Sequence, residues 1–345
     1  MKALGVADVL VIGGGPAGLA AAIAIRSKGL EVVVMDAASP PIDKACGEGI
    51  MPSGVEALRR LGVDLSSDDA FPLRGIRFIG DGSRAEAGFK GESGIALRRT
   101  RLQRILADRA SEVGVRLRWG APVNLASGLP PSRWIIGADG LNSRVRSAAR
   151  LDSAYSESKR FGFRQHYRLA PWTDFVEVHW GTRRQIYVTP VGQDEIGVAM
   201  LSRDSHIRLT GALAGFPELR SRLEGAETST AERGGVTVTR RLRGVVRGNT
   251  ALIGDASGSV DAITGDGISL SFQQALALAQ ALCEGKLEAY EAEHRRIMRR
   301  PVLIARSLLC MERFPPVRRA ALTVLAHQPA VFSKLLHMHA AGRAG

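Results

Sequence analysis

The sequence is poor in cysteine, in aromatic residues and in long apolar segments. Its 3 cysteines among 345 residues are Cys46, Cys283 and Cys310, and no two of them have Cys-x-x-Cys spacing. This excludes a disulfide framework, a dithiol redox relay and a cysteine-rich zinc site, and no metal is expected. So few cysteines favour a reducing compartment, which predicts a cytoplasmic protein.

No apolar run reaches the length of about 18 residues that a membrane-spanning helix needs. The longest candidate, Val9–Ile25, is interrupted by four glycines and Pro16. The first residues, Met1–Asp8, lack the pattern of a secretion signal. With 45% hydrophobic and 23% charged residues, the composition excludes a disordered chain or a coiled coil and fits one large or two modest domains.

Acidic residues are also fewer than basic residues. The chain carries 47 Lys and Arg against 34 Asp and Glu, a net charge of +13. This balance favours anionic partners such as nucleic acid, acidic lipid or a phosphate-bearing cofactor. The arginines are scattered, and aromatic residues that could stack on bases make up only 5% of the chain, so no nucleic-acid partner is expected.

What the sequence does have is a strand, a glycine-rich turn, a helix and a second strand within the first 36 residues. Asp8–Ile12 and Glu31–Met35 are short apolar strands, and Pro16–Lys28 has helical spacing with proline at its start. A helical crossover between them predicts that the two strands are parallel.

The turn has the G-x-G-x-x-G spacing of a dinucleotide-binding loop. Its residues are Gly13, Gly15, Pro16, Ala17 and Gly18. Gly13 permits the tight turn, Gly15 lets a pyrophosphate approach the backbone, and Gly18 lets the helix pack on the strand. The helix N-terminus favours the phosphates, and Asp36, at the end of the second strand, can accept hydrogen bonds from ribose hydroxyls.

Further along, an antiparallel block interrupts the α/β pattern. Its four expected strands are 164–169, 175–180, 185–189 and 195–200. A long helix follows over 266–284, and the chain beyond Lys286 is helical and basic with breaks at Pro315, Pro316 and Pro329. We therefore predict a discontinuous nucleotide-binding domain over 1–155 and 245–300, an inserted β-rich substrate domain over 156–244, and a C-terminal helical segment over 301–345.

Two further motifs follow expected strands: Asp139-Gly140-Leu-Asn-Ser143-Arg-Val145-Arg146, and Gly254-Asp255-Ala. With the glycine-rich turn, this ordered triple resembles the FAD-dependent enzymes of the p-hydroxybenzoate hydroxylase fold (group A flavoprotein monooxygenases). The resemblance spans residues 8 to about 270. It implies an α/β fold with a Rossmann-like FAD-binding domain that carries an inserted antiparallel sheet.

The resemblance also implies roles for single residues. Asp255 would bind the ribityl chain of FAD, Asp139 is associated with FAD and nicotinamide use, Arg99 opens a helix beside the cofactor, and Val123 contacts the adenine side. The remaining expected contacts, at the isoalloxazine ring and the start of the long helix, are Gly265, Gly267 and Ile268. Without the resemblance, Asp255 could be a turn residue and Arg99 a surface charge.

A Cys46-Gly47-x-Gly loop resembles the geranylgeranyl reductase branch of the same fold, as does the strand Ile186-Tyr187-Val-Thr-Pro190. In that strand Thr189 replaces the tryptophan of the branch, so the branch is indicated and its prenyl substrate is not. Cys46 is a candidate catalytic thiol, a flavin attachment point or a small packing residue. Tyr187 either lines a substrate pocket or belongs to the core of the sheet.

Several histidines and the basic C-terminal segment each allow more than one interpretation. His166 and His179, on the expected antiparallel strands, are either general bases or half-exposed polar residues of the sheet. His337 and His339 lack partners for a metal site and are interpreted as a fraying tail. The segment 303–336 either lies on an anionic membrane surface or forms an amphipathic helix pair that closes the domain.

Only one G-x-G-x-x-G is present, so NADH or NADPH must reduce FAD transiently without a Rossmann unit of its own. Our first hypothesis is an NAD(P)H-dependent monooxygenase that hydroxylates a phenolic or lipid-like metabolite through a flavin C4a-hydroperoxide. The alternative is a geranylgeranyl reductase-like enzyme that reduces carbon–carbon double bonds of an isoprenoid-like substrate. A third hypothesis, of another class, is a non-catalytic flavin-binding protein associated with membrane or nucleic acid.

Overall fold

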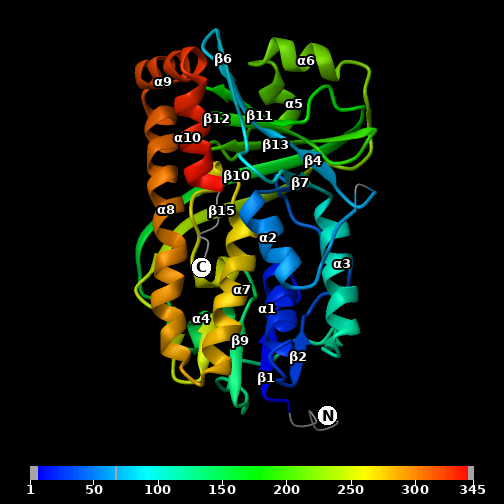
Figure 1. The fold of residues 1–345 in the computed structure, drawn as a ribbon, viewed down its shortest axis with the longest axis vertical. Helices are drawn as coiled ribbons and strands as arrows, with labels where there is room; N and C mark the ends of the chain where they lie inside the picture. Colours follow the sequence, from blue (N-terminus) through cyan, green and yellow to red (C-terminus); the bar gives the residue numbers. More distant parts are fainter. Residues whose placement is uncertain (1–6, 67, 341–345) are drawn as a thin grey trace.

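The computed structural model describes residues 7–66 and 68–340. Most of the segment judged not to be a secretion signal, and the last five residues of the expected C-terminal segment, lie outside the described residues. The chain forms two large sheets at opposite ends, with helices and a small third sheet between and beside them (Figure 1).

The first sheet carries the glycine-rich turn. It has six strands in the order β16-β17-β9-β1-β2-β8, namely Val246–Arg247, Thr250–Leu252, Trp134–Gly137, Val9–Ile12, Val32–Met35 and Arg116–Arg118. β1 lies between β2 and β9 and is parallel to both, as the crossover pattern predicted. The helices packed with it are α1 (Pro16–Arg26), α3 (Arg99–Glu112) and α7 (Gly267–Cys283). Its interior is continuously apolar, as expected for a parallel sheet covered by helices.

The second sheet is the expected antiparallel block, which the structure confirms and enlarges. Six of its strands come from the inserted region, and the five longer ones are β10 (Ala154–Arg168), β11 (Phe175–Gly181), β12 (Arg184–Pro190), β13 (Glu195–Ser202) and β15 (Arg233–Leu242). The short β14 (Glu227–Thr228) pairs with β10 at one edge. Two short helices, α5 (Leu209–Leu213) and α6 (Pro217–Leu223), cover one face of this sheet.

Two strands of this sheet come from a segment that the sequence placed in the first domain. β5 (Gly75–Gly80) pairs in parallel with β11, and β6 (Ser83–Gly88) pairs with β5. Ile76 of β5 is buried with Val178 and Trp180 of β11 in one apolar cluster. The predicted boundary at residue 155 therefore does not separate the segments that build the two sheets.

Shorter elements join the sheets. β3 (Gly49–Ile50), β7 (Gly94–Ala96) and β4 (Phe71–Leu73) form a small third sheet, next to α2 (Pro52–Arg60). The helix α4 (Arg144–Ala148) and the 3-10 turns η1 (Gly254–Ser257) and η2 (Ala262–Thr264) carry the later motifs.

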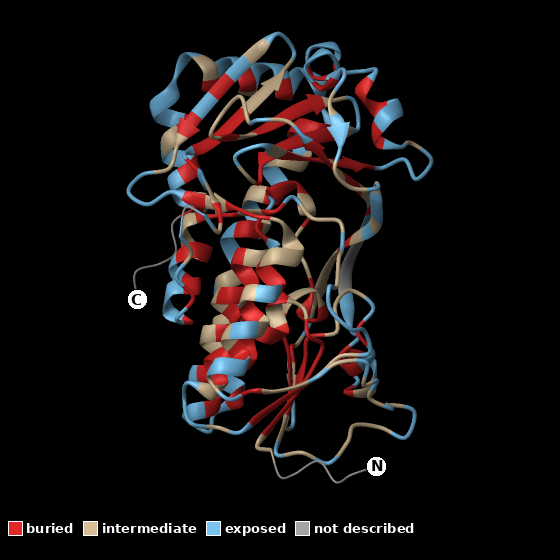
Figure 2. Cartoon of the chain, turned by 90° about the vertical axis from the view of Figure 1, so that its right-hand side faces the viewer, coloured by how far each residue is buried: buried red, intermediate tan, exposed pale blue. Residues whose placement is uncertain are grey.

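The C-terminal helices are α8 (Leu287–Arg313), α9 (Pro315–His327) and α10 (Pro329–Ala340), and α9 and α10 begin at the expected prolines. α8 runs across the predicted boundary at residue 300. Leu322 of α9 and Phe332 of α10 are buried in the cluster that contains Ile76, so this helix pair closes one face of the second sheet. Figure 2 shows that the strands of the sheets are mostly buried, whereas the helices expose their outer faces. Within residues 7–66 and 68–340 no helix is long and apolar enough to cross a membrane.

Candidate active site

One cavity of about 560 Å³ is lined by residues of all three motifs. Gly13 and Gly15 line it from the first turn, Asp139 from the second motif, and Asp255 from the third. The second sheet forms its opposite wall. Segments more than 200 residues apart in the chain thus converge on one space, as the resemblance implied.

Two of the three glycines of the G-x-G-x-x-G motif, Gly13 and Gly18, have no room for a side chain. A Cβ at Gly13 would lie 2.3 Å from the Ala138 carbonyl oxygen, and one at Gly18 would lie 1.9 Å from the Gly13 carbonyl oxygen. Gly13 also has φ +113°, a conformation that favours glycine. Gly15 instead faces open space, where the nearest atom to a Cβ is an Arg99 nitrogen at 3.9 Å. The turn therefore offers bare backbone to a ligand, with Pro16 and Ala17 also lining the cavity.

Asp36 supports this turn from β2. Its Oδ2 accepts a hydrogen bond of 2.6 Å from the Gly14 amide, and its Oδ1 accepts one of 2.8 Å from the Ala38 amide. Each carboxylate oxygen can accept a second hydrogen bond, and Asp36 lines the cavity. The carboxylate can thus hold the turn and receive ribose hydroxyls at once.

Arg99 lies where phosphates would sit. It is the first residue of α3 and lines the cavity near Gly15. Its Nε atom is buried and has no hydrogen-bond partner within the described part of the chain. A buried guanidinium nitrogen without a partner is costly, and the terminal Arg99 nitrogen near Gly15 is placed to contact an oxyanion beside the turn. Val123 lines the adjacent part of the cavity.

Asp139 lines the cavity and also accepts hydrogen bonds from the residues at the start of α4. Its Oδ1 accepts a hydrogen bond from the Ser143 hydroxyl at 2.5 Å, and its Oδ2 accepts from the Arg144 amide at 2.7 Å. Ser143 in turn caps α4. The carboxylate therefore shapes the start of α4, which is a structural task that the motif alone did not reveal.

Asp255 forms an ion pair with Lys44, whose Nζ lies 2.8 Å from Asp255 Oδ2, and both residues line the cavity. Loss of hydration raises the pKa of Asp255, but Lys44 and the more distant Arg99 outweigh this, and the pKa falls below its usual value. The η1 turn that carries Asp255 is anchored because Gln274 Oε1 accepts a hydrogen bond of 2.9 Å from the Gly254 amide. The carboxylate is therefore ionised and held in place.

The loop before α7 is shaped by Asp261, whose Oδ1 accepts a hydrogen bond of 3.1 Å from the Ile263 amide. Gly265 has φ +71°, and a Cβ at Gly265 or Gly267 would meet no atom within 4 Å. Both glycines and Ile268 line the cavity. The structure thus leaves a flat, open backbone surface at the N-terminus of α7, suited to a planar ring.

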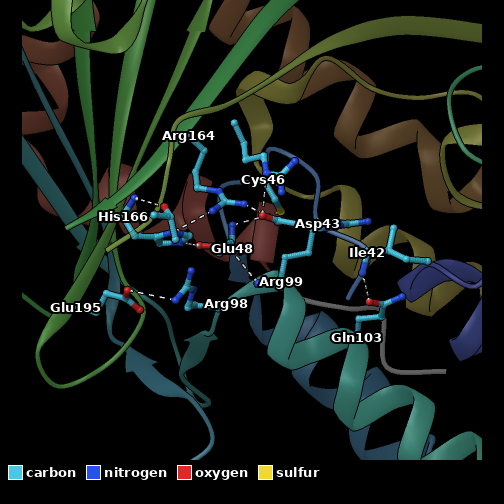
Figure 3. A network of polar contacts seen from close by, with 12 residues as sticks. Ile42, Asp43, Cys46, Glu48, Arg98, Arg99, Gln103, Arg164, His166 and Glu195 are labelled. Carbon is cyan, nitrogen blue, oxygen red and sulfur yellow. Dashed lines mark hydrogen bonds and ion pairs between the residues drawn. The ribbon is translucent and has the colours of Figure 1, made fainter. Parts of the chain in front are cut away.

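The Cys46 loop is fixed by a buried network of charges (Figure 3). Cys46 lines the cavity, and its Sγ accepts a hydrogen bond of 3.4 Å from the Glu48 amide. Glu48 is 3% exposed and has φ +61°. Its Oε2 lies 2.6 Å from His166 Nε2, and its Oε1 accepts a hydrogen bond of 2.9 Å from the Arg99 amide.

Arg164 extends this network from His166 to Asp43. Its Nη1 lies 2.8 Å from His166 Nδ1, and its Nη2 donates a hydrogen bond of 2.6 Å to Asp43 Oδ1. Sequence reasoning missed Glu48, because no spacing indicates a partner 118 residues away.

The structure does not bring the two candidate histidines to the cavity. His166 is fully buried in the network around Glu48. His179 lies 3.2 Å from Glu177 and packs against the Phe216 ring. Both expectations, a general base at the substrate and a half-exposed sheet residue, therefore fail. Tyr187 does line the cavity, and its hydroxyl donates a hydrogen bond of 2.9 Å to the Ile263 carbonyl.

The interpretation of His337 and His339 as a fraying tail is wrong. Both belong to α10, and the His339 side chain is buried beside Asp266 at the start of α7. No group of three or more His, Cys, Asp and Glu within the described ranges could hold a metal ion.

These features fit FAD: a bare glycine turn, the Arg99 guanidinium beside it, and an open glycine surface further along one cavity. A family model described as an FAD binding domain matches residues 6–127. The fold is that of p-nitrophenol 4-monooxygenase from Pseudomonas putida, with a TM-score of 0.80, 16% identity, and coverage of 98% of this chain and 99% of that one. The chain is an FAD-dependent oxidoreductase with the p-hydroxybenzoate hydroxylase fold.

Two of the relatives that match most of the chain are reductases, and a dialkyldecalin synthase of Streptomyces rugosporus, 24% identical, matches 79% of it. Menaquinone reductase of Mycobacterium tuberculosis is 29% identical over 312 residues, 80% of this chain and 76% of that protein. Digeranylgeranylglycerophospholipid reductase of Thermoplasma acidophilum is 25% identical over 315 residues, 80% of this chain and 78% of that protein. Rifampicin monooxygenase of Rhodococcus hoagii is 31% identical over a shorter region, 40% of this chain and 33% of that protein.

Proposed function

We propose that this protein is an FAD-dependent reductase that saturates a carbon–carbon double bond of an isoprenoid lipid. The observation that carries the proposal is the wall that the second sheet presents to the cavity. Apart from the Thr237 hydroxyl and Arg164, that wall consists of apolar residues and glycines: Gly162, Phe163, Tyr187, Ala199, Met200, Leu201, Gly235, Val236 and Val238. The similarity to reductases along four-fifths of the chain supports the same proposal.

The wall suits a hydrocarbon better than a phenol. Arg164 is already engaged by Asp43 and His166, and the Tyr187 hydroxyl by Ile263. A phenol would need a base to remove its proton before hydroxylation, and neither candidate histidine lies on this wall. An isoprenoid chain needs no polar partner and is stabilised by burial of its apolar surface.

Cys46 is the group placed to handle a proton. When bound and reduced, FAD would supply the hydride for one carbon of the double bond. The other carbon would take a proton, and the Cys46 thiol lies in the cavity to donate it. Solvent would return a proton to the thiolate. In this proposal Gly47 keeps the loop close to the ring, and Glu48 fixes the loop through His166.

The FAD contacts follow from the cavity lining. We assign the pyrophosphate to Gly13, Gly15 and Arg99, the ribose to Asp36, and the ribityl chain to Asp255. The ring would lie on Gly265, Gly267 and Ile268, and Val123 would face the adenine. NADH or NADPH would reduce the flavin transiently.

Contact with the cytoplasmic face of a membrane would bring such a substrate to the enzyme. Among the residues whose burial the structure describes, the exposed large apolar side chains other than Val236 all lie between residues 303 and 338, namely Leu303, Phe314, Val317, Val324, Val331, Leu335 and Met338. We call these seven residues the C-terminal apolar face. Arg306, Arg313, Arg319 and Lys334 are exposed among them. Basic and apolar residues on the same helices suit an anionic bilayer surface.

Monooxygenation is the second candidate function, supported by the similarity to rifampicin monooxygenase and by the fold. One experiment separates the two. Purified holoenzyme is supplied with NADPH and either a polyprenyl quinone or a phenol, once under nitrogen and once in air. The masses of the products are determined by mass spectrometry. A reductase adds two hydrogens to the polyprenyl chain in both atmospheres. A product that gains an oxygen atom, formed only in air, overturns the proposal in favour of monooxygenation.

A further inference from the structure

The loop beneath the proposed ring is supported from behind by the last described helix. Asp266 immediately precedes α7 and is 5% exposed. Its Oδ1 lies 2.9 Å from Nε2 of His339 on α10, and the two side chains are 6% and 9% exposed. The end of α10 reaches the start of α7 in Figure 1. No hydrogen bond of good geometry from the described residues ends on Asp266 Oδ1, so its contact with His339 is chiefly electrostatic.

Asp266 does not perform the usual task of an acidic residue at this position. An aspartate before a helix commonly accepts hydrogen bonds from the first amides, but the Asp266 side chain makes no such bond. Asp261 and Ser143, by contrast, cap the elements that follow them. The first amides of α7 are therefore left free of a side-chain cap, and Gly265 and Gly267 leave the space in front of them open.

The surroundings of His339 favour its protonated form. Burial lowers its pKa, but the Asp266 carboxylate and the Thr264 backbone carbonyl raise it further, so that it exceeds the usual histidine value. The neighbouring charges beside η2 pair among themselves: Arg160 contacts both Asp261 and Glu312. Asp266 is thus the charged partner of His339, and the pair is neutral as a whole.

We propose that His339 is a positioning residue for the flavin: in its protonated form it holds the carboxylate of Asp266, a residue that lines the cavity, and offsets its charge, leaving the amides of α7 free to stabilise the reduced, anionic ring. The inference rests on the proposed placement of the ring over Gly265 and Gly267. An uncompensated carboxylate at this point would oppose the positive end of the helix. α10 is then part of the redox site, although it contributes no residue to the cavity lining.

The test is the midpoint potential of bound FAD, measured by equilibrium reduction without substrate. For His339→Gln we expect the preference for reduced over oxidised FAD to fall about tenfold, a shift of about 30 mV for a two-electron couple. The difference from wild type should vanish as the pH rises and His339 loses its proton. His337→Gln, at an exposed position on the same helix, should leave the potential unchanged.

A second variant, Asp266→Asn, distinguishes loss of the His339 charge from general damage to the fold by His339→Gln. Asp266→Asn removes the carboxylate, so adding His339→Gln to it should cause no further fall in potential. Equal potentials and equal pH profiles for wild type and a folded His339→Gln protein would overturn the inference. Since no substrate is present, failure of double-bond reduction leaves this result standing. Failure of the chain to bind FAD would overturn both proposals.

Discussion

His166 Nε2 lies 2.6 Å from Glu48 Oε2, and this buried contact joins the Cys46 loop to β10 of the second sheet. Glu48 also accepts a hydrogen bond from the first amide of α3. One carboxylate thus connects the cavity loop, the substrate sheet and the helix that begins with Arg99. Its loss should affect cofactor binding and folding together.

We expect Glu48→Gln to lower the free energy of unfolding by about 2 kcal/mol, because a charged partner is removed from a buried hydrogen-bonded pair. FAD should also bind more weakly, since Arg99 and the Cys46 loop lose a shared anchor. Urea unfolding and fluorescence titration with FAD measure the two effects. Glu56→Gln on the exposed face of α2 is the matched control, and a Glu48→Gln protein as stable as that control would refute the anchoring role.

The Lys44–Asp255 pair leads to a prediction on cofactor retention. Asp255→Ala should weaken FAD binding about tenfold, because a hydrogen bond to an ionised group contributes about 1.5–3 kcal/mol. The visible absorbance of FAD that remains bound after gel filtration measures retention. Asp194→Ala, at an exposed position, should retain normal FAD. Full occupancy of the Asp255→Ala protein would remove Asp255 from the cofactor contacts.

The first half of the site was predictable because its geometry is local. Glycine is required at Gly13 and Gly18 by atoms of the same strand–turn–helix unit or of the segment after β9, and such constraints leave a spacing in the sequence. The later loops were found through their order along the chain. Asp36 and Asp255 accordingly lie on the cavity, as expected.

The remainder depends on contacts between distant segments. β5 pairs with β11 across about 100 residues, and Glu48 meets His166 across 118. His339 reaches Asp266 only because α10 folds back over the second sheet. No periodicity records such pairings, so a histidine two residues from another histidine near the chain end was misread as part of a tail.

Acid should destabilise the second sheet through Glu177. Burial raises the pKa of this carboxyl, but hydrogen bonds from His179, Arg77 and Trp172 outweigh it and lower the pKa to about 2. A depressed carboxyl pKa stabilises the fold above the unfolded value of 4.5, and the contribution is lost as the pH falls from there towards 2. It amounts to roughly 3 kcal/mol.

Glu177→Gln should therefore be less stable than wild type at pH 7, and the two should converge as the pH falls below 4.5. Thermal unfolding followed by circular dichroism over this range measures the difference. Glu224→Gln, at an exposed position after α6, should match wild type throughout. A constant gap between the Glu177→Gln and wild-type curves down to pH 2 would show that the ionisation of Glu177 is not responsible.

The C-terminal apolar face predicts binding to anionic vesicles. Leu335 is 51% exposed on α10, and burying a leucine in the interface contributes about 1.5–3 kcal/mol. Leu335→Glu should therefore reduce cosedimentation with phosphatidylserine-containing vesicles by at least tenfold. Ser111→Glu, an exposed helical position on α3, adds the same charge elsewhere and should have little effect. Wild-type protein that remains unbound at low salt would disprove the membrane contact.

The thiol of Cys46 gives the sharpest chemical prediction. If it donates the proton to the substrate, Cys46→Ala should lower kcat by at least about a hundredfold, the lower range for a positioned acid. FAD content should stay normal, because the Cys46 side chain is not needed to hold the cofactor. Cys46→Ser should fall between the two, since a hydroxyl can hydrogen-bond but is a weaker acid. Cys283→Ala and Cys310→Ala, both at exposed sites, should behave as wild type. Near-normal turnover by Cys46→Ala would instead assign Cys46 to packing, and the proton would then have to come from water.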